Sequence, residues 1–369
     1  FKILSQNIFI TDSLQSQKDD YFDSKEIVDV IDVYLQRQTL CLFENKLKKK
    51  REQYQEIVDE LENEIGIDED DKNRPVSQAE YQKRIQEISD CFVDRNDFEK
   101  NKKLGQGSFG MVFSGIQKST SKVVAIKELF LTNIKAGDLK SLIYEVGIMS
   151  KIRHYGILPL IGYIPDSPYT IITEFMSGGT LDDRIFNSKL KPLGGTKLTI
   201  IALGVAYTMK FMHNNKYYHR DLKPENIILD ADDYPYIIDF GLSRRAPEDE
   251  SQLMTNQIGT LAFMAPELME DVPYDGKVDV YAYAVTLWIM LTGQKPYKNL
   301  NQMQLMMRVS SGQRPSIPAD AGQMGVLIEK CWNEDYNKRP TFEEIVELLE
   351  TDRNFITENV DEDEYLNYI

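Results

Sequence analysis

Apolar residues recur at helical spacing through the first quarter of the chain. Two stripes show this spacing: Ile27, Val30, Ile31, Tyr34 and Leu35, and then Leu47, Tyr54, Val58, Leu61 and Ile65. Positions three or four residues apart share one face of a helix, so we predict a helical extension over residues 1–98. The simplest interpretation is a helical hairpin that packs on another surface. The second stripe also fits a short coiled-coil seam, although Arg51 occupies one seam position.

The pattern changes near residue 99. Glycines appear, and short β-branched runs at residues 111–113 and 123–126 alternate with turn residues, which predicts a small antiparallel sheet. Beyond about residue 180, long helical patterns take over. A β-rich half followed by an α-rich half indicates an α+β fold. Residues 351–369 include four consecutive acidic residues at 361–364, and we expect a solvated acidic tail there.

Composition narrows the classes of function. The 369 residues are 42% hydrophobic and 28% charged, as in globular proteins, and the net charge of −16 argues against a broad surface for nucleic acids or anionic membranes. Apolar stretches at 199–206 and 278–291 are too short to form transmembrane helices. Three widely spaced cysteines indicate neither a disulfide framework nor a zinc site, so we expect an intracellular, cytoplasmic setting. Because the chain begins at Phe1 rather than at a methionine, we expect its natural start to lie upstream.

A glycine-rich turn is the first candidate for chemistry. Gly105, Gly107 and Gly110 are spaced G-x-G-x-x-G and are followed by Val112. Dinucleotide-binding turns use the same spacing but open a helix, whereas these glycines lead into a second strand. A glycine hairpin suits a flap over nucleotide phosphates, because the backbone must approach the phosphate oxygens closely and a Cβ would obstruct some of the required dihedral angles. By itself this spacing is weak evidence.

Lys127 ends an apolar strand that spans residues 124–127. A buried ammonium group without a partner is costly, so Lys127 requires an anion or a carboxylate. The α- and β-phosphates of ATP would supply the anion, and Glu145, on the next helical stretch, would supply the carboxylate. The alternative for this tetrapeptide alone is a surface lysine at the end of an edge strand.

Residues 219–226 read HRDLKPEN, and the triplet DFG begins at Asp239, eighteen residues after Asp221. With these motifs the sequence resembles the eukaryotic protein kinase family. The resemblance covers about two thirds of the chain and continues through APE at residues 265–267, Cys331-Trp332 and Arg339-Pro340. It implies a bilobal kinase domain at residues 99–350, with an N-lobe at 99–173, a hinge at 174–177 and a C-lobe at 178–350.

The resemblance also assigns roles to residues. Asp221 would accept the proton of the substrate hydroxyl, Lys223 would contact the γ-phosphate, and Asn226 and Asp239 would hold magnesium ions. Thr173 would be the gatekeeper, and the backbone of Glu174 and Met176 would pair with the adenine edge. The apolar residues expected around the nucleotide are Leu104, Val112, Ala125 and Ile228. The alternative for those four side chains is that they belong to the core, and the two interpretations are compatible.

Substrate class and regulation follow from the same resemblance. Lys223 and Thr260 match serine/threonine kinases, although Leu261 replaces the proline often found next. Trp288 and the pair at 331–332 resemble the tyrosine-kinase-like branch. Because Arg220 precedes the catalytic aspartate, we expect regulation by phosphorylation between residues 241 and 265. The candidates are Thr255, which is favoured, and Ser251.

Three further expectations complete the picture. The resemblance implies a buried ion pair between Glu267 and Arg339. The helical extension could form a dimer, dock a partner or cap the small lobe. A pseudokinase scaffold and a dual-specificity or tyrosine kinase remain as alternatives, although Lys127, Asp221 and Asp239, whose loss is usual in pseudokinases, are all present.

Overall fold

The computed structural model describes residues 77–106, 110–130, 135–190, 192–240, 244–245, 261–269, 275–351 and 360–368. All of them belong to one compact unit, residues 59–369. The predicted helical stripes before residue 77 lie outside these ranges. No helix in the described part is both long enough and apolar enough to cross a membrane.

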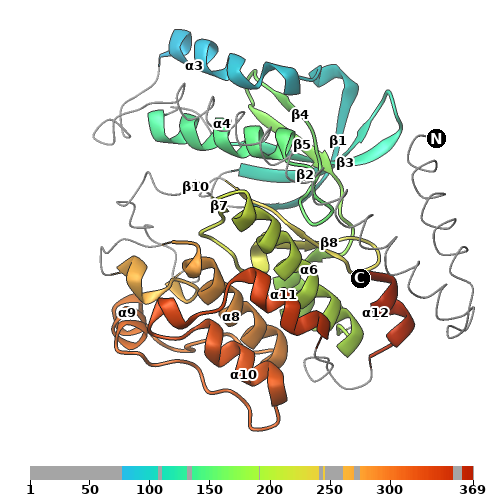
Figure 1. Cartoon of the computed structure of the whole chain (residues 1–369). Coiled ribbons are helices and arrows are strands. Elements are labelled where there is room, and N and C mark those ends of the chain that lie inside the picture. Colours follow the sequence, from blue (N-terminus) through green and yellow to red (C-terminus); the bar gives the residue numbers. More distant parts are fainter. Residues whose placement is uncertain are drawn as a thin grey trace, which may run out of the picture. The chain divides into compact units, whose positions relative to one another are not determined.

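A five-stranded antiparallel sheet forms the first lobe (Figure 1). The strands are β1 Phe98–Gln106, β2 Gly110–Gln117, β3 Lys122–Leu129, β4 Leu160–Ile164 and β5 Thr170–Glu174, in the spatial order β1-β2-β3-β5-β4. Helix α4, Ala136–Lys151, packs against this sheet. The pairing places Val112 opposite Lys127 and Ala125 opposite Thr173, so residues expected at the nucleotide site lie on adjacent strands.

The second lobe is mainly helical. Its α-helices are α5 Leu181–Phe186, α6 Gly195–Asn214, α8 Lys277–Thr292, α9 Gln302–Ser310, α10 Gly322–Cys331, α11 Phe342–Thr351 and α12 Glu362–Tyr368. Helix α8 is buried without interruption from Val278 to Met290, as expected for a helix that is apolar all round. Helix α10 packs on α8, and α11 packs on α6. This confirms the α+β bilobal architecture expected from the sequence.

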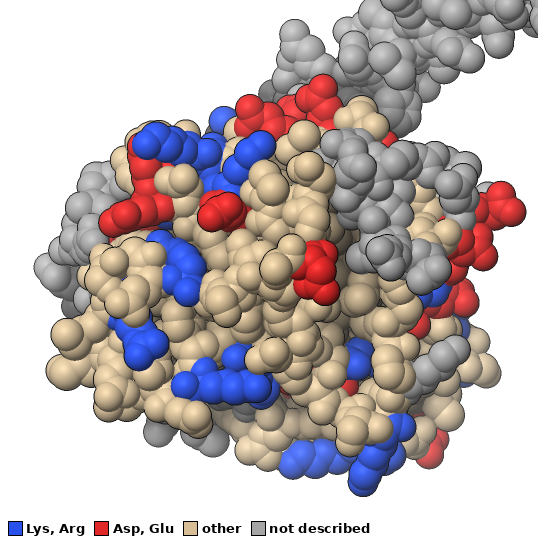
Figure 2. Space-filling model, turned by 90° about the horizontal axis from the view of Figure 1, so that it is seen from below, with Lys and Arg blue, Asp and Glu red and all other residues tan. Residues whose placement is uncertain are grey.

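Short elements between these helices carry the motifs. Strands β6 Gly179–Thr180, β8 Ile227–Leu229 and β9 Pro235–Ile237 form one small sheet, and β7 Tyr217–Tyr218 pairs with β10 Arg244–Arg245. The 3-10 turns are η4 Pro224–Asn226, η5 Pro266–Met269 and η6 Tyr336–Lys338. On the face of the molecule seen in Figure 2, charged side chains of both signs form small, separate groups.

Residues 77–97 lie against the sheet lobe. Helix α3, Gln78–Ile85, and the 3-10 turn η2, Gln86–Cys91, run alongside α4, and η3, Arg95–Asp97, leads into β1 (Figure 1). Strand β4 is an edge strand, and Phe92 forms a parallel bridge with its Tyr163. The described end of the predicted extension therefore caps the small lobe, which was one of the three alternatives open at the sequence level.

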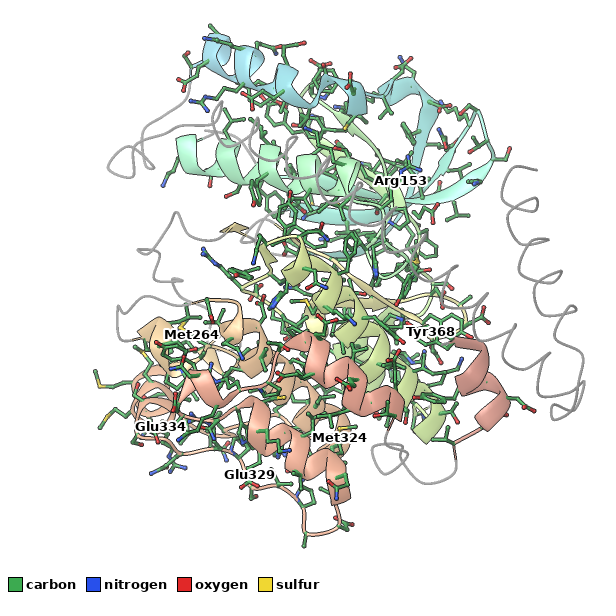
Figure 3. The ribbon with its side chains drawn as sticks, viewed as in Figure 1. Arg153, Met264, Met324, Glu329, Glu334 and Tyr368 are labelled. Carbon is green, nitrogen blue, oxygen red and sulfur yellow. The ribbon has the colours of Figure 1, made fainter. Side chains whose placement is uncertain are left out.

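Residues 360–368 do not form the solvated tail that their acidic sequence led us to expect. They form α12, in which Tyr365 is 1% exposed and donates a hydrogen bond of 3.0 Å to the Leu349 carbonyl. Tyr368 lies between α12 and α6 (Figure 3), and its hydroxyl fits over Gly204, where a Cβ would come within 2.1 Å of it. Two tyrosines three residues apart give α12 an aromatic face, while Asp363 stays exposed.

His154, in the loop between α4 and β4, links the two lobes. Its ring stacks on Phe211 of α6 at 4.5 Å between centroids, and its Nδ1 accepts a hydrogen bond of 3.1 Å from the Gly156 amide. Burial lowers the pKa of His154 to about 4. His154 therefore binds a proton less readily in the folded protein than in the unfolded chain, where it is protonated below about pH 6.5.

We expect His154 to make folding depend on pH. Between about pH 6.5 and pH 4 the unfolded state binds more protons at this residue, so stability falls as the pH falls, by about 2 kcal/mol between pH 7 and pH 5. The variant His154→Phe keeps a ring on Phe211 but cannot titrate. Urea unfolding of both proteins at both pH values measures the difference, since the carboxylates titrate alike in the two. Equal pH dependence would contradict the prediction.

Candidate functional site

Lys127 and Glu145 meet between the sheet and α4. The Lys127 Nζ lies 2.9 Å from a carboxylate oxygen of Glu145, and both side chains are largely buried. Burial opposes the charge on Lys127, but the negative charges of Glu145 and Asp239 outweigh it and raise the pKa of the lysine. Lys127 is therefore a cation that pairs with Glu145 of α4 and that also interacts electrostatically with Asp239. This excludes the surface-lysine alternative.

Asp221 lies at the centre of the second group of residues. Its Oδ2 accepts hydrogen bonds from Lys223 Nζ at 2.6 Å and from Asn226 Nδ2 at 2.8 Å. The Asn226 amide also donates to the Asp221 backbone carbonyl, at 2.7 Å, which orients both side chains. The other carboxylate oxygen, Oδ1, is buried and has no hydrogen-bond partner among the described residues. A buried acceptor of this kind is normally satisfied by a donor such as a water molecule or a substrate group.

Asp279 holds the turn that carries Asp221 in place. Arg220 adopts a left-handed backbone conformation, with φ of 64°, which is strained for a residue with a side chain. The Asp279 carboxylate, fully buried on α8, accepts hydrogen bonds from the backbone amides of His219 at 2.9 Å and Arg220 at 2.7 Å. His213 Nε2 lies 2.9 Å from the same carboxylate. These bonds offset the strain and fix the position of Asp221.

Asp239 is brought next to Asn226 by backbone pairing. Strands β8 and β9 pair directly before it, and the Ile238 amide donates to the Asn226 carbonyl at 3.0 Å. The backbone φ of Asp239 is 68°, again left-handed. His219 contacts the residues on both sides of Asp239. Its Nε2 lies 3.1 Å from the Ile238 carbonyl oxygen, and its ring packs edge-on against Phe240. His219 thus has a structural role.

The pair Asn226 and Asp239 fits a divalent metal ion by its chemistry. The amide nitrogen of Asn226 is used by Asp221, which leaves its oxygen available, and Asp239 supplies a carboxylate. Oxygen ligands are those that Mg²⁺ prefers, and it usually completes its shell with water and substrate phosphates. Within the described ranges there is no cluster of three or more His, Cys, Asp or Glu that could hold a metal ion, so a purely protein-built metal cage is not present there.

The apolar residues expected around the nucleotide are only partly covered. Val112, Ala125 and Ile228 are half-buried, and Leu104 is 46% exposed. Thr173 and Met176 are 8% exposed on β5 and just after it. The Glu174 amide donates to the Pro159 carbonyl at 3.1 Å, so its amide is already used within the protein. Incompletely buried apolar side chains on both lobes suit a flat aromatic ligand.

The glycines of the predicted phosphate flap differ in whether the surrounding structure requires glycine. A Cβ on Gly110 would lie 2.2 Å from the Glu128 carbonyl oxygen of β3, so close approach of two strands alone requires glycine there. A Cβ on Gly105 would have nothing within 4 Å. Open space at Gly105 is compatible with the phosphate approach expected from the sequence. Gly107 and the regulatory candidates Ser251, Thr255 and Thr260 lie outside the described residues.

The buried ion pair between Glu267 and Arg339 is confirmed. The two guanidinium nitrogens Nη1 and Nη2 lie 2.5 and 2.9 Å from the two carboxylate oxygens, and the side chains are 1% and 5% exposed for Arg339 and Glu267. Arg339 also donates to the carbonyls of Asn333 and Lys277. This pair joins η5 to the turn before α11. Its role is therefore to hold these two segments together, which is separate from the role of Asp221.

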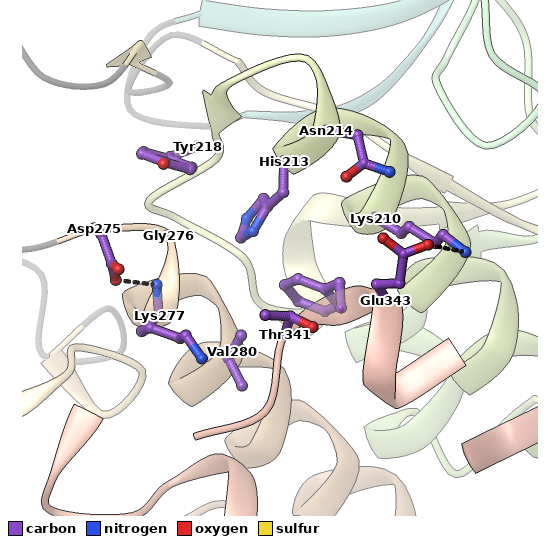
Figure 4. Close-up of a pocket in the computed structure, with 11 residues that line it drawn as sticks. Lys210, His213, Asn214, Tyr218, Asp275, Gly276, Lys277, Val280, Thr341 and Glu343 are labelled. Atoms are coloured by element: carbon purple, nitrogen blue, oxygen red, sulfur yellow. Dashed lines mark hydrogen bonds and ion pairs between the residues drawn. The ribbon is translucent and has the colours of Figure 1, made fainter. Parts of the chain in front are cut away.

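A separate cavity of about 240 Å³ lies next to His213, the residue that contacts Asp279 (Figure 4). Its lining includes His213, Tyr218 and Lys277, together with Lys210 and Glu343, which form an ion pair at 3.1 Å. None of Lys127, Asp221, Asn226 or Asp239 lines it. His213 borders both this cavity and Asp279, and sequence reasoning missed it because a single histidine near the end of a helix carries no pattern.

Comparison with known proteins agrees with this geometry. A family model described as "protein tyrosine and serine/threonine kinase" matches residues 98–349. The serine/threonine-protein kinase STY17 of Arabidopsis thaliana is 38% identical over 70% of this chain and 45% of its own length. STY46 of the same plant is 35% identical over 67% of this chain and 43% of its own length.

One relative carries a broader name. The dual specificity protein kinase shkB of Dictyostelium discoideum is 33% identical over 72% of this chain and 42% of its own length. The chain thus spans less than half the length of these three relatives. The similarity covers the two lobes rather than the whole of the related proteins.

Proposed function

The chain belongs to the protein tyrosine and serine/threonine kinase family, and from that premise we propose that it transfers the γ-phosphate of ATP to serine or threonine hydroxyls of protein substrates. The observation that carries the proposal is the state of Asp221. One of its carboxylate oxygens is held by Lys223 and Asn226, and the other is buried with no partner among the described residues. A substrate hydroxyl is the donor that this oxygen suits.

The proposed division of work follows from phosphoryl transfer, which depends on positioning and on stabilising charge. Asp221 orients the substrate hydroxyl and receives its proton. The cation of Lys223, 2.6 Å from the same carboxylate, lies where negative charge on the transferred group would be stabilised. Lys127, held by Glu145, binds the phosphates. This family uses ATP, and Asn226 and Asp239 are the oxygen ligands we assign to Mg²⁺, which neutralises phosphate charge when bound.

Serine and threonine are the proposed acceptors for two reasons. Lys223 occupies the position that distinguishes serine/threonine kinases in the resemblance, and STY17 and STY46 are named as serine/threonine-protein kinases. The name of shkB favours dual specificity as the second candidate, because that protein is similar over the same part of the chain. The pseudokinase alternative is disfavoured by the complete set of Lys127, Asp221 and Asp239.

Phosphotransfer with labelled ATP and Mg²⁺ tests the proposal. We expect wild-type protein to label itself or a general protein substrate, and Asp239→Asn to lose nearly all of this label, because the proposed metal ligand loses its charge. Acid hydrolysis of the labelled protein should yield phosphoserine and phosphothreonine. Phosphotyrosine in addition would establish dual specificity, and no label above the Asp239→Asn level in wild type would overturn the kinase proposal.

We also propose that phosphorylation of Thr255, or of Ser251, activates the enzyme through an attractive contact between the added phosphate and Arg220. Thr260 would bridge Asp221 and Lys223. Peptide mapping of the labelled protein from the same assay identifies the modified residue, and label that maps to neither candidate would count against this mode of regulation.

We place the protein in the cytoplasm, where ATP and Mg²⁺ are available and its three cysteines need no disulfide partners. The helical stripes before residue 77 are proposed to bind a partner or a second copy of the chain. Comparing the oligomeric state of the full chain with and without a charge placed in the second stripe, as in Leu61→Glu, tests self-association. An unchanged monomer in both would contradict it.

A further inference from the structure

We propose that residues 77–97, called here the N-terminal brace, hold α4 in the position at which Glu145 meets Lys127, with Tyr81 as the central positioning residue. The inference rests on the proposed function for its consequence in catalysis. It goes beyond that function because the family match begins at residue 98, after the brace ends. The brace therefore lies outside the residues that the family model matches.

The brace and α4 share one hydrophobic cluster. Tyr81, Ile85 and Ile88 are 0–2% exposed. They are four and three residues apart, which is the spacing of residues on one face of a helix. The residues they pack with come from α4 and from the sheet: Leu139, Leu142, Ile143, Val146, Tyr163, Tyr169 and Ile171. Removing the brace would expose the part of this apolar surface that it covers, so α4 depends on the brace for part of its packing.

Hydrogen bonds define where Tyr81 sits. Its hydroxyl lies 3.1 Å from the Pro165 carbonyl and 2.9 Å from the Tyr163 hydroxyl. Because the carbonyl only accepts, Tyr81 donates a hydrogen bond to Pro165 and accepts one from the Tyr163 hydroxyl. The ring also packs against Tyr169, at 4.9 Å between centroids. Tyr81 is thus fixed to the turn between β4 and β5 on one side while its ring supports α4 on the other.

Backbone and side-chain contacts connect the rest of the brace to the sheet. The Val93 amide donates to the Tyr163 carbonyl at 3.1 Å, and a Cβ on Gly162 would lie 2.3 Å from the Val93 side chain. Arg95 Nη2 donates to the carbonyls of Asp166 and Pro168 at 2.6 and 2.8 Å. The brace is therefore anchored to the rigid sheet at one end and contacts the helix at the other, which is the arrangement needed to set the position of a helix.

The link to the active site runs through one turn of α4. Val146, which is fully buried in the shared cluster, directly follows Glu145. Adjacent residues project about 100° apart around a helix, so the face that packs on the brace and the side chain that reaches Lys127 move together. A rotation or shift of α4 would separate the 2.9 Å pair. Tyr81 touches neither nucleotide nor substrate in this scheme and acts only through Glu145.

A double-mutant cycle in the full chain separates positioning from general destabilisation. We compare Tyr81→Ala and Glu145→Gln, singly and together, and measure kcat and the KM for ATP at a temperature where all remain folded. The matched control is Tyr283→Ala, since Tyr283 is also 1% exposed and its hydroxyl also donates to a backbone carbonyl, that of Ala202, but it lies in the helical lobe. Tyr81→Phe and Tyr283→Phe replace the alanine variants if either of those fails to fold.

We expect Tyr81→Ala to lower kcat/KM for ATP about tenfold, and Tyr283→Ala to lower it less than about twofold. In the Glu145→Gln background, Tyr81→Ala should add less than about twofold, because the contact that it positions is already lost. Additive effects of Tyr81 and Glu145, or equal effects of the two tyrosines, would overturn the proposal.

Hydrogen exchange tests the same claim without catalysis. Amides of residues 136–151 should exchange faster in Tyr81→Ala than in wild type or Tyr283→Ala, because α4 loses its support. If wild-type protein shows no phosphotransfer, the proposed function fails but this measurement still decides the inference. If wild type is active and α4 exchanges alike in all three proteins, the inference alone fails.

Discussion

Replacing Asp221 with asparagine is expected to lower kcat by about 100-fold or more, because an amide cannot accept the proton of the substrate hydroxyl. The substitution is almost isosteric, and an amide oxygen at the Oδ2 position can still accept the hydrogen bonds from Lys223 and Asn226. The fold and the proposed metal ligands are left in place. The KM for ATP should therefore change little, so the loss appears in kcat.

The matched control for Asp221→Asn is Asp335→Asn. Asp335 caps η6 on the surface, and asparagine serves equally well as a cap, so this variant should behave as wild type. Steady-state phosphotransfer at saturating ATP measures both. Asp221→Asn that keeps more than about a tenth of the wild-type kcat would contradict the role assigned to the carboxylate.

Replacing Arg339 with leucine is expected to lower the free energy of unfolding by about 3–5 kcal/mol. The reason is that Glu267, 5% exposed, would keep its charge in the protein interior without a partner. The carbonyls of Asn333 and Lys277 would lose a donor as well. This is the largest stability effect we expect from any single ion pair described here, and it is separate from catalysis, because neither residue contacts Asp221 or Asp239 in the described structure.

The neighbouring residue provides the control. Lys338 has a 69% exposed side chain and lies 3.5 Å from Asp335, so Lys338→Leu should cost less than about 1 kcal/mol. The double variant Glu267→Leu, Arg339→Leu should recover part of the loss, since no charge remains buried. Urea unfolding measures all of these. Equal costs for Arg339→Leu and Lys338→Leu would show that burial of the pair is energetically unimportant.

The parts of the site that could be predicted are those encoded in contiguous motifs. Asp221, Lys223 and Asn226 lie within six residues, so the local chain almost dictates that they meet. Lys127 needs Glu145 from eighteen residues away, and this pairing followed from the cost of burying an ammonium group without a partner. Glu267 and Arg339 are 72 residues apart and were predicted only through the family resemblance.

The parts that escaped prediction depend on which surfaces meet. The helical extension was predicted from the stripes at residues 27–35 and 47–65, and no sequence pattern placed Tyr81, Ile85 and Ile88 against α4. In the C-terminal segment the acidic run at residues 361–364 led us to predict a solvated tail, and the spacing of Tyr365 and Tyr368 was overlooked. The charge indicated exposure to solvent, whereas the hydrogen bond of Tyr365 to α11 and the packing of Tyr368 on α6 hold this segment against the protein. Local sequence indicates which secondary structure a segment favours, whereas tertiary contacts determine which surfaces it packs against.

The Phe92 bridge to β4 bears on the tendency of the protein to aggregate. A sheet that ends in an unprotected strand offers free amides and carbonyls to another molecule and invites aggregation. Here residues 92–93 occupy the open side of β4 at Tyr163. A shortened protein that begins at residue 98, where the family match begins, would uncover this strand together with the apolar patch under Tyr81. Loss of solubility would then be the first sign that the natural boundary of the folded unit lies upstream.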